Sequence, residues 1–337
     1  MSSNPILEVK GLKVSFFSKE KLIPAVDDIS FELKEGEILG IVGESGSGKS
    51  VTALASMGLV PIPPGKIENG EILFTGKNLL IYSDKEMRKI RGNQISMIFQ
   101  EPMTSLNPLF TIGDQIIEAL RLHTKMSKAQ AKNKSIELLK LVGIPRAEAI
   151  VGEYPHQLSG GMRQRVMIAM AMACNPRILI ADEPTTALDV TIQAQILSLM
   201  KDLNEKMNTS IILITHDLGV VAEICDRVLV MYCGQIVEHG DVHTILKEPK
   251  HPYTKGLLKS VPDLLGKKDR LYSIPGNVPR PGTIKKGCSF APRCEERFEQ
   301  CLEKSPQLYT MKTAGHEVRC YLHKTEGGSR DHVRSTP

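Results

Sequence analysis

The chain has 337 residues, enough for two domains, and its hydrophobic fraction of 41% and charged fraction of 24% are those of an ordinary globular protein. The N-terminus lacks the basic and apolar blocks of a signal peptide, and no run approaches 18 apolar residues, so we expect a cytoplasmic protein without a membrane span. The net charge of +5 arises in residues 256–337, with 15 Lys+Arg against 9 Asp+Glu. This excess could face an anionic leaflet, another subunit or solvent, whereas nucleic-acid binders more often show a denser basic patch with interleaved aromatics.

The N-terminal segment is expected to form short β-strands. Residues 6–9 and 12–17 favour strands, and residues 29–33 alternate apolar and polar side chains at a period of two. Phe16 or Phe17 could stack on a nucleotide base or fill the core, and the residues alone favour the core.

A glycine-rich stretch follows an expected strand over residues 37–42 and precedes an expected helix over residues 51–59. Its fixed positions fit G-x-x-x-x-G-K-[ST], the phosphate-binding loop. Glycines allow successive N–H groups to point at an anion, and the helix N-terminus adds partial positive charge. The lysine would reach the β- and γ-phosphates and the serine hydroxyl would bind Mg²⁺. We therefore predict a nucleoside triphosphate site at Gly43, Glu44, Ser45, Gly46, Ser47, Gly48, Lys49, Ser50 and Val51.

The middle of the chain is expected to hold an inserted helical subdomain, at about residues 101–170. Residues 95–99 form an apolar strand that ends at Gln100, and the prolines that follow indicate a loop. Apolar residues then recur at helical spacing over residues 111–142. Further on, Ser159 is a candidate N-cap for a helix whose first glycines leave N–H groups open to an anion.

Two carboxylates end the apolar strand expected over residues 178–183. A strand that is apolar on both faces is typical of a parallel sheet, whose ligands bind at the carboxyl ends of its strands. Asp182 would approach the Mg²⁺ ion held by Ser50, and Glu183 would position an attacking water. His216 ends the next apolar strand, residues 210–215, and is expected at the same edge.

These motifs together resemble the ATP-binding-cassette (ABC) ATPases in order and spacing: the phosphate loop, Gln100, Leu158-Ser159-Gly160-Gly161, Asp182-Glu183, Asp189 and His216. Met162 stands where the family usually has Gln, and contact through Ser159 and backbone N–H groups is still expected. Residues 100–108, 182–195 and 251–254 further resemble the ATPase subunits of bacterial dipeptide and oligopeptide importers. The resemblance implies an α/β fold: an ABC-type phosphate-loop ATPase core with an antiparallel β subdomain and the helical insertion over residues 1–255, and a small Cys-rich C-terminal region over residues 256–337.

The resemblance also implies roles for individual residues. The catalytic set is Glu183, which polarises the attacking water, His216, which hydrogen-bonds the γ-phosphate, and Gln100, which senses the γ-phosphate. The remaining implied contacts are stacking of adenine on Phe16, Mg²⁺ binding by Ser50, Gln100 and Asp182, and ATP binding on the partner subunit by Ser159, Gly160 and Gly161.

The implied function is to power import of di- or oligopeptides at the cytoplasmic face of the cell membrane. Its partners would be two integral membrane permeases, a second ABC ATPase in a head-to-tail dimer (an identical copy or a paralogue) and, indirectly, a peptide-binding protein, with no nucleic acid. Two alternatives are a soluble ABC ATPase acting on nucleic acid or ribosomes, and a module that binds ATP without hydrolysing it. The single cassette argues against the first, and Glu183 with His216 against the second.

Four of the seven cysteines crowd into residues 288–320: Cys288, Cys294, Cys301 and Cys320. In a reducing compartment such a cluster suggests a metal more than disulfides, although free thiols are a third interpretation. The spacing fits neither the usual zinc pairs nor the ferredoxin patterns and does not decide between the metals. The family resemblance implies a [4Fe–4S] cluster, with zinc as the alternative, that staples a tail lacking its own core.

Overall fold

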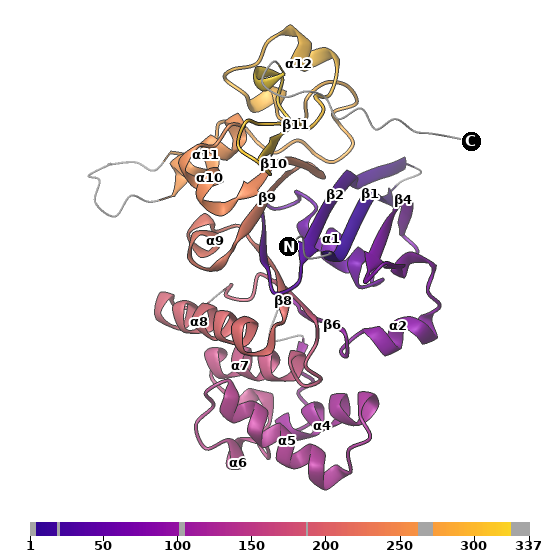
Figure 1. The fold of residues 1–337 in the computed structure, drawn as a ribbon, viewed down its shortest axis with the longest axis vertical. Coiled ribbons are helices and arrows are strands. Elements are labelled where there is room, and N and C mark those ends of the chain that lie inside the picture. Colours follow the sequence, from indigo (N-terminus) through magenta and orange to yellow (C-terminus); the bar gives the residue numbers. More distant parts are fainter. Residues whose placement is uncertain (1–4, 19–20, 101–104, 187, 262–271, 325–337) are drawn as a thin grey trace.

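Two β-sheets organise the chain in the computed structural model, which describes residues 5–18, 21–100, 105–186, 188–261 and 272–324 (Figure 1). The smaller sheet is antiparallel, with the strand order β2-β1-β4-β5. It confirms the expected antiparallel β subdomain. Its strands are β1 (Pro5–Ser18), β2 (Lys21–Lys34), β4 (Gly65–Phe74) and β5 (Lys77–Asn78).

The first strand is longer than the sequence pattern predicts. Residues 6–9 and 12–17 lie in one strand, β1, whose pairing with β2 shifts register between Val9 and Leu12. A bulge of this kind adds a residue to one strand without ending it. Gly11, at φ +55, occupies the shift. The interrupted alternation that suggests two strands therefore reflects a bulge.

The larger sheet has eight strands in the order β11-β12-β10-β9-β3-β8-β7-β6. The five from β9 to β6 are parallel, and β10 and β12 are added antiparallel at one edge. Every residue of β3, β7 and β8 is buried, as their apolar sequences predict. The strands are β3 (Ile38–Val42), β6 (Ile95–Ile98), β7 (Ile178–Asp182), β8 (Ser210–Thr215), β9 (Arg227–Tyr232), β10 (Gln235–Asp241), β11 (Tyr309–Thr310) and β12 (Glu317–Val318).

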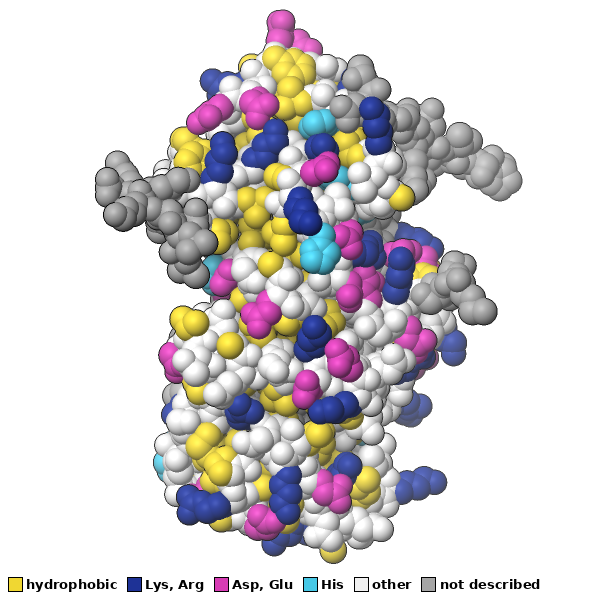
Figure 2. Space-filling model, turned by 60° about the vertical axis from the view of Figure 1, so that its left-hand side comes forward, with side chains coloured by type: hydrophobic (Ala, Val, Ile, Leu, Met, Phe, Trp, Pro, Cys, Tyr) yellow, Lys and Arg dark blue, Asp and Glu magenta, His cyan; other side chains and the backbone are white. Residues whose placement is uncertain are grey.

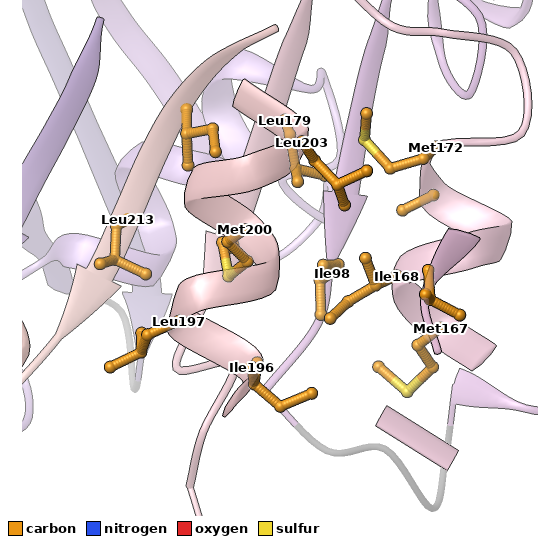
Figure 3. Close-up of a cluster of buried hydrophobic side chains, with 14 of the residues drawn as sticks. Ile98, Met167, Ile168, Met172, Leu179, Ile196, Leu197, Met200, Leu203 and Leu213 are labelled. Atoms are coloured by element: carbon orange, nitrogen blue, oxygen red, sulfur yellow. The ribbon is translucent and has the colours of Figure 1, made fainter. Parts of the chain in front are cut away.

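The two faces of the larger sheet bury two separate apolar cores. One core lies toward the small sheet and includes Leu39, Ile41 and Ile180. The other lies under the long helices, where Ile168 and Met200 pack toward the sheet residue Leu179 (Figure 3). Helices over the sheet and beside the small sheet are α1 (Lys49–Ser56), η1 (Leu79–Ile81), α2 (Asp84–Ile90), α8 (Val190–Met207), α9 (Leu218–Ile224) and α10 (Val242–Lys247).

The helical insertion forms the lower part of the molecule in Figure 1. Residues 111–142, whose apolar side chains recur at helical spacing, form two helices, because Thr124 ends the first in an extended conformation and Ser127 caps the second with Gln130. Residues 101–104, where the predicted subdomain begins, lie outside the described residues. The elements are α4 (Ile112–His123), α5 (Lys128–Leu141), α6 (Ala147–Ile150), η2 (Pro155–Gln157) and α7 (Gly160–Ala171).

The C-terminal region packs onto the edge of the larger sheet, where β12 pairs with β10. Contrary to expectation, it has a small apolar cluster of its own, which includes Tyr309, Met311 and Val318. Within the described residues, no helix is both long and apolar enough to cross a membrane. Helix α11 (Pro252–Ser260) crosses the predicted boundary at residue 256 and is grouped here with the C-terminal region. The other elements of this region are η3 (Ala291–Arg293), α12 (Glu299–Glu303) and η4 (Tyr321–His323), with β11 and β12.

Candidate active site

The glycine-rich loop joins β3 to α1 and curls tightly against its neighbours. Gly48 has φ +101, and a Cβ there would lie 2.6 Å from the carbonyl oxygen of Ala25. A Cβ at Gly43 would lie 2.2 Å from the carbonyl oxygen of Met231. No side chain fits at either position, so both glycines are required by close backbone approach. The loop precedes an eight-residue helix, as the sequence predicts.

Lys49 is buried inside the loop. Its Nζ donates to the carbonyl oxygens of Gly43 at 2.7 Å and Glu44 at 3.0 Å. Burial lowers the pKa of Lys49, while the carboxylates of Glu183 and Asp182 act in the opposite direction. The third contact of Lys49 Nζ is with the Ser47 hydroxyl at 3.4 Å. A buried ammonium group whose hydrogen-bond acceptors are all neutral is suited to neutralise a polyphosphate.

Ser50 and Asp182 come together at the carboxyl end of β7. The Ser50 hydroxyl donates to the Asp182 carboxylate at 3.2 Å. Burial raises the pKa of Asp182, so a bound cation would favour its ionised form. One hydroxyl and one carboxylate are oxygen donors of the kind that Mg²⁺ uses when phosphates complete its coordination. The pair fits the predicted Mg²⁺ site.

Three side chains converge on Glu183, which follows Asp182. Gln100 Nε2 donates to its carboxylate at 3.2 Å, Thr186 Oγ1 donates at 2.9 Å, and His216 Nδ1 lies 3.4 Å from the other oxygen. The structure thus brings together all three predicted catalytic residues. The sequence did not point to Thr186 as a member of this site, although Thr186 lies in the 182–195 segment and only three residues from Glu183.

The backbone and charge of Glu183 are both unusual. Its φ is +49, a left-handed conformation that is strained for a side-chain-bearing residue and is typical of functional sites. Burial alone would raise the pKa of Glu183, but contacts with Thr186 and His216 outweigh burial and lower the pKa below its ordinary value. The carboxylate is therefore ionised at neutral pH, as a group that polarises water must be.

The Ser-Gly-Gly motif lies at the start of α7, within the helical insertion. Ser159 caps this helix by accepting from Met162 N at 3.3 Å, and both Ser159 and Gly160 are exposed. Gly161 faces α8, where a Cβ would lie 2.9 Å from Ile192. In Figure 1, α7 lies near α5, whereas α1, which follows the phosphate loop, lies beside the small sheet. The motif therefore presents open N–H groups on a surface separate from the phosphate loop.

The two candidate adenine residues differ in exposure. Phe16 is half-buried and packs against the core shared with the small sheet, next to Gly65. Phe17, on the opposite face of β1, is 55% exposed. Phe16 thus lies partly in the core, as the residues alone favoured, and part of its side chain stays accessible.

The metal site predicted at the four C-terminal cysteines is wrong. All four lie in the described part of the chain and line one cavity of about 20 Å³, yet no group of three or more His, Cys, Asp or Glu side chains there is arranged to hold a metal ion. Burial raises the pKa of Cys288 and Cys294, and that of Cys320 to about 12. In the absence of a metal, burial therefore favours the neutral thiol at these three positions. Neither the [4Fe–4S] cluster nor the zinc alternative is supported.

Comparison with known proteins identifies the family of this site. A family model described as ABC transporter matches residues 26–186, and one described as oligopeptide/dipeptide transporter, C-terminal region, matches residues 237–301. The chain is 57% identical over 325 residues to the oligopeptide transport ATP-binding protein AppD of Bacillus subtilis (strain 168), covering 96% of this chain and 99% of that protein. The chain belongs to the ABC transporter ATP-binding family. Its match to the dipeptide transport ATP-binding protein DppD of Haemophilus influenzae is 51% over 324 residues, covering 96% and 97%.

Solved structures of ABC proteins share the fold. The ATP-binding cassette MJ0796, in a dimeric post-hydrolysis state bound to ADP and Pi, matches with a TM-score of 0.64 and 31% identity over 70% of this chain and 98% of its own. CbiO1 of Clostridium perfringens, part of the transporter complex cbiONQ, matches with a TM-score of 0.62 and 28% identity over 73% and 92%. The ABC ATPase assignment from the sequence is confirmed, and the chain is an ATP-hydrolysing transporter subunit.

Proposed function

We propose that this ABC ATPase powers the import of di- or oligopeptides. The observation that carries the proposal is the match of residues 237–301 to the C-terminal region of oligopeptide/dipeptide transporters, in the same chain as the phosphate loop and the side chains that converge on Glu183. Relatives named as oligopeptide and dipeptide transport ATP-binding proteins align along almost the whole chain. The peptide specificity would reside in other subunits, because this chain supplies the motor.

The geometry supports a division of roles in hydrolysis. The loop from Gly43 to Val51 would enclose the phosphates, with Lys49 neutralising the β- and γ-charges. Ser50 and Asp182 would hold Mg²⁺, which neutralises charge on the phosphates when bound, with the side chain of Gln100 nearby. Glu183, oriented by Thr186, would polarise the attacking water, and His216 would contact the γ-phosphate. Catalysis of this kind relies on positioning and electrostatics.

The exposed Ser-Gly-Gly motif supports action as a dimer. Ser159, Gly160 and Gly161 would complete an ATP site on a second ABC ATPase packed head to tail, and Phe16 would stack on adenine in this chain's own site. ATP would close such a dimer because the γ-phosphate contacts both subunits. Closure would move two permease subunits held at the cytoplasmic face of the membrane, and a peptide-binding protein would deliver the substrate. In this arrangement residues 1–255 form the ATP-binding unit and residues 256–337 a region particular to peptide importers.

Action on nucleic acid or ribosomes is not favoured. The relatives are transport proteins, and basic and acidic side chains of the described residues are interspersed on the face shown in Figure 2. Phosphate-backbone recognition instead uses clustered basic charge.

The test is reconstitution in proteoliposomes with two integral membrane permease subunits and a second ABC ATPase. We expect ATPase activity to rise when a peptide-loaded binding protein is added, and labelled peptide to accumulate in the lumen. An ATPase that responds to ribosomes or nucleic acid and not to the loaded binding protein would overturn the proposal.

A further inference from the structure

A buried arginine of the C-terminal region reaches the phosphate loop. Arg293 lies in η3, 249 residues from Glu44, the second residue of that loop. Its guanidinium makes a two-pronged contact with the Glu44 carboxylate, at 2.7 Å through Nη1 and 3.1 Å through Nη2. The Arg293 side chain is 4% exposed and that of Glu44 is 30% exposed. Exposed ion pairs contribute little, but a shielded two-pronged pair fixes geometry as well as charge.

A second contact fixes the same loop residue through its backbone. The hydroxyl of Tyr253, in α11, accepts the N–H of Glu44 at 2.9 Å. Tyr253 is fully buried and packs against the rings of Tyr232 and Phe290, at centroid distances of 4.7 and 5.4 Å. The N–H of Glu44 is thus directed at this hydroxyl, so Glu44 contributes to the loop as an anchoring point.

Arg293 is itself held rigidly. Its Nε donates to the carbonyl oxygen of Pro275 at 3.0 Å, and Nη2 also lies 3.3 Å from that of Ile274. A guanidinium fixed by backbone acceptors on one side can orient a carboxylate on the other. The Arg293 side chain therefore forms a bridge of defined geometry between the C-terminal region and the phosphate loop.

The bridge leads directly to the phosphate-binding lysine. The carbonyl oxygens that hold Lys49 Nζ belong to Gly43 and Glu44, the residue that Arg293 and Tyr253 anchor. A shift of the Glu44 backbone would displace both carbonyl oxygens and with them the ammonium group. The C-terminal region is in this way connected to the site by two hydrogen-bonded steps.

We propose that Arg293 and Tyr253 are positioning residues that hold the phosphate loop in its ATP-binding conformation, so that the C-terminal region sets the affinity of this chain for ATP. The inference rests on the nucleotide site assigned above to residues 43–51. Because coupling between sites is reciprocal, ATP binding also tightens the C-terminal region around Arg293.

The first test is steady-state ATPase kinetics of the complete transporter with the variant R293M. We expect the KM for ATP to rise about tenfold while kcat changes less than about twofold, because the loop is misplaced before binding. R293K does not restore the KM, since an ammonium group cannot make both contacts. The matched control is R319M: Arg319, also in the C-terminal region, donates to the carbonyl oxygens of Ile236 and Pro306, outside η3 and the phosphate loop. A wild-type KM in R293M, or an equal rise in R319M, overturns the proposal.

A double-mutant cycle tests whether Glu44 is the residue through which Arg293 affects the KM for ATP. E44Q should raise the KM by a similar factor, and R293M should add little in the E44Q background. Independent, multiplicative effects would contradict the bridge. If R293M does not fold, Y253F removes the second contact while keeping the ring, and a wild-type KM in Y253F then overturns the proposal. The variant K49A separates this inference from the assignment of the nucleotide site. Unchanged ATP binding in K49A refutes the nucleotide site. If K49A loses ATP binding but R293M keeps a wild-type KM for ATP, only the bridge is refuted.

Hydrogen exchange gives a readout that a purely structural role would not move. In an E183Q background, which retains MgATP, we expect ATP to slow amide exchange in residues 288–301 severalfold, and we expect R293M to abolish this response. ATP-induced protection that persists in R293M would overturn the coupling.

Discussion

Glu183 concentrates the chemistry of the site in one strained residue. Its positive φ turns the carboxylate away from the course of β7 and toward Gln100, Thr186 and His216. A left-handed glutamate costs free energy that the surrounding contacts must offset. Those contacts also keep the carboxylate ionised, so strain and electrostatics serve the same purpose.

Replacing this carboxylate tests its role as the base. E183Q preserves the shape and the contact with Thr186 but cannot polarise water, so we expect turnover to fall about 10²- to 10⁴-fold with ATP affinity retained. Turnover and nucleotide binding are measured separately on the purified variant. E35Q, at an exposed pair with Arg177, is the control. Near-wild-type turnover in E183Q would remove Glu183 from the role.

The hydroxyl of Thr186 should affect the pH dependence of kcat. Its hydroxyl helps to keep the pKa of Glu183 below the ordinary value of 4.5, and the carboxylate is inactive when protonated. In T186V this pKa rises, so the acidic limb of the kcat profile should move to higher pH. T186S keeps the hydroxyl and should keep the wild-type limb. Superimposable profiles for T186V and wild type would contradict this arrangement.

At the scale of elements, the segment between β6 and α4 is the proposed connection to the permease. By resemblance to the importer ATPases, the loop after Gln100 would contact the permease, but Leu106 in this loop is buried in the core under the long helices. Leu109 and Phe110, which precede α4, are 80% and 52% exposed. Exposed apolar side chains beside the active-site loop are suited to contact another subunit.

Substitution of Leu109 and Phe110 should uncouple ATP hydrolysis from peptide uptake. We expect L109S together with F110S to keep basal ATPase activity, because neither side chain contributes to the site, and to lose peptide uptake in proteoliposomes. L122S, an exposed leucine in the last turn of α4, is the matched control. Uptake that remains proportional to ATPase activity would place the permease contact elsewhere.

Sequence reasoning succeeded where the signal is local. The phosphate loop and the mainly apolar strands β7 and β8 are recognisable from consecutive residues, and the edge that the two strands share follows from the parallel sheet. It failed where partners are distant in the chain. The residues near Glu44 do not predict its contact with Arg293, and the residues near β10 do not predict its pairing with β12. The clustering of the four cysteines and the family resemblance misled, because nearness along the chain does not report how side chains are arranged in space.

At the scale of the whole molecule, a buried carboxylate joins the cassette to its C-terminal region. Glu238, in β10, is fully buried and accepts the N–H groups of Lys250 at 2.6 Å and His251 at 3.0 Å. His316, just before β12, lies 2.8 Å from the same carboxylate. One side chain thus connects the sheet, the start of α11 and the added strand.

Glu238 should make the docking of the C-terminal region sensitive to acid. Burial alone would raise the pKa of Glu238, but the contacts with His316 and with the backbone N–H groups of Lys250 and His251 outweigh burial and lower it. A depressed pKa contributes stability that is present above the unfolded value of about 4.5 and is lost as pH falls through the folded value.

We expect E238A to cost on the order of 3 kcal/mol in the free energy of unfolding near pH 7, since it leaves buried donors unpaired. Urea unfolding at pH 7 and pH 4 measures both effects, and E248Q, at an exposed glutamate beside Lys250, is the control. An E238A variant that matches E248Q in stability and in pH dependence would show that this carboxylate does not hold the C-terminal region in place.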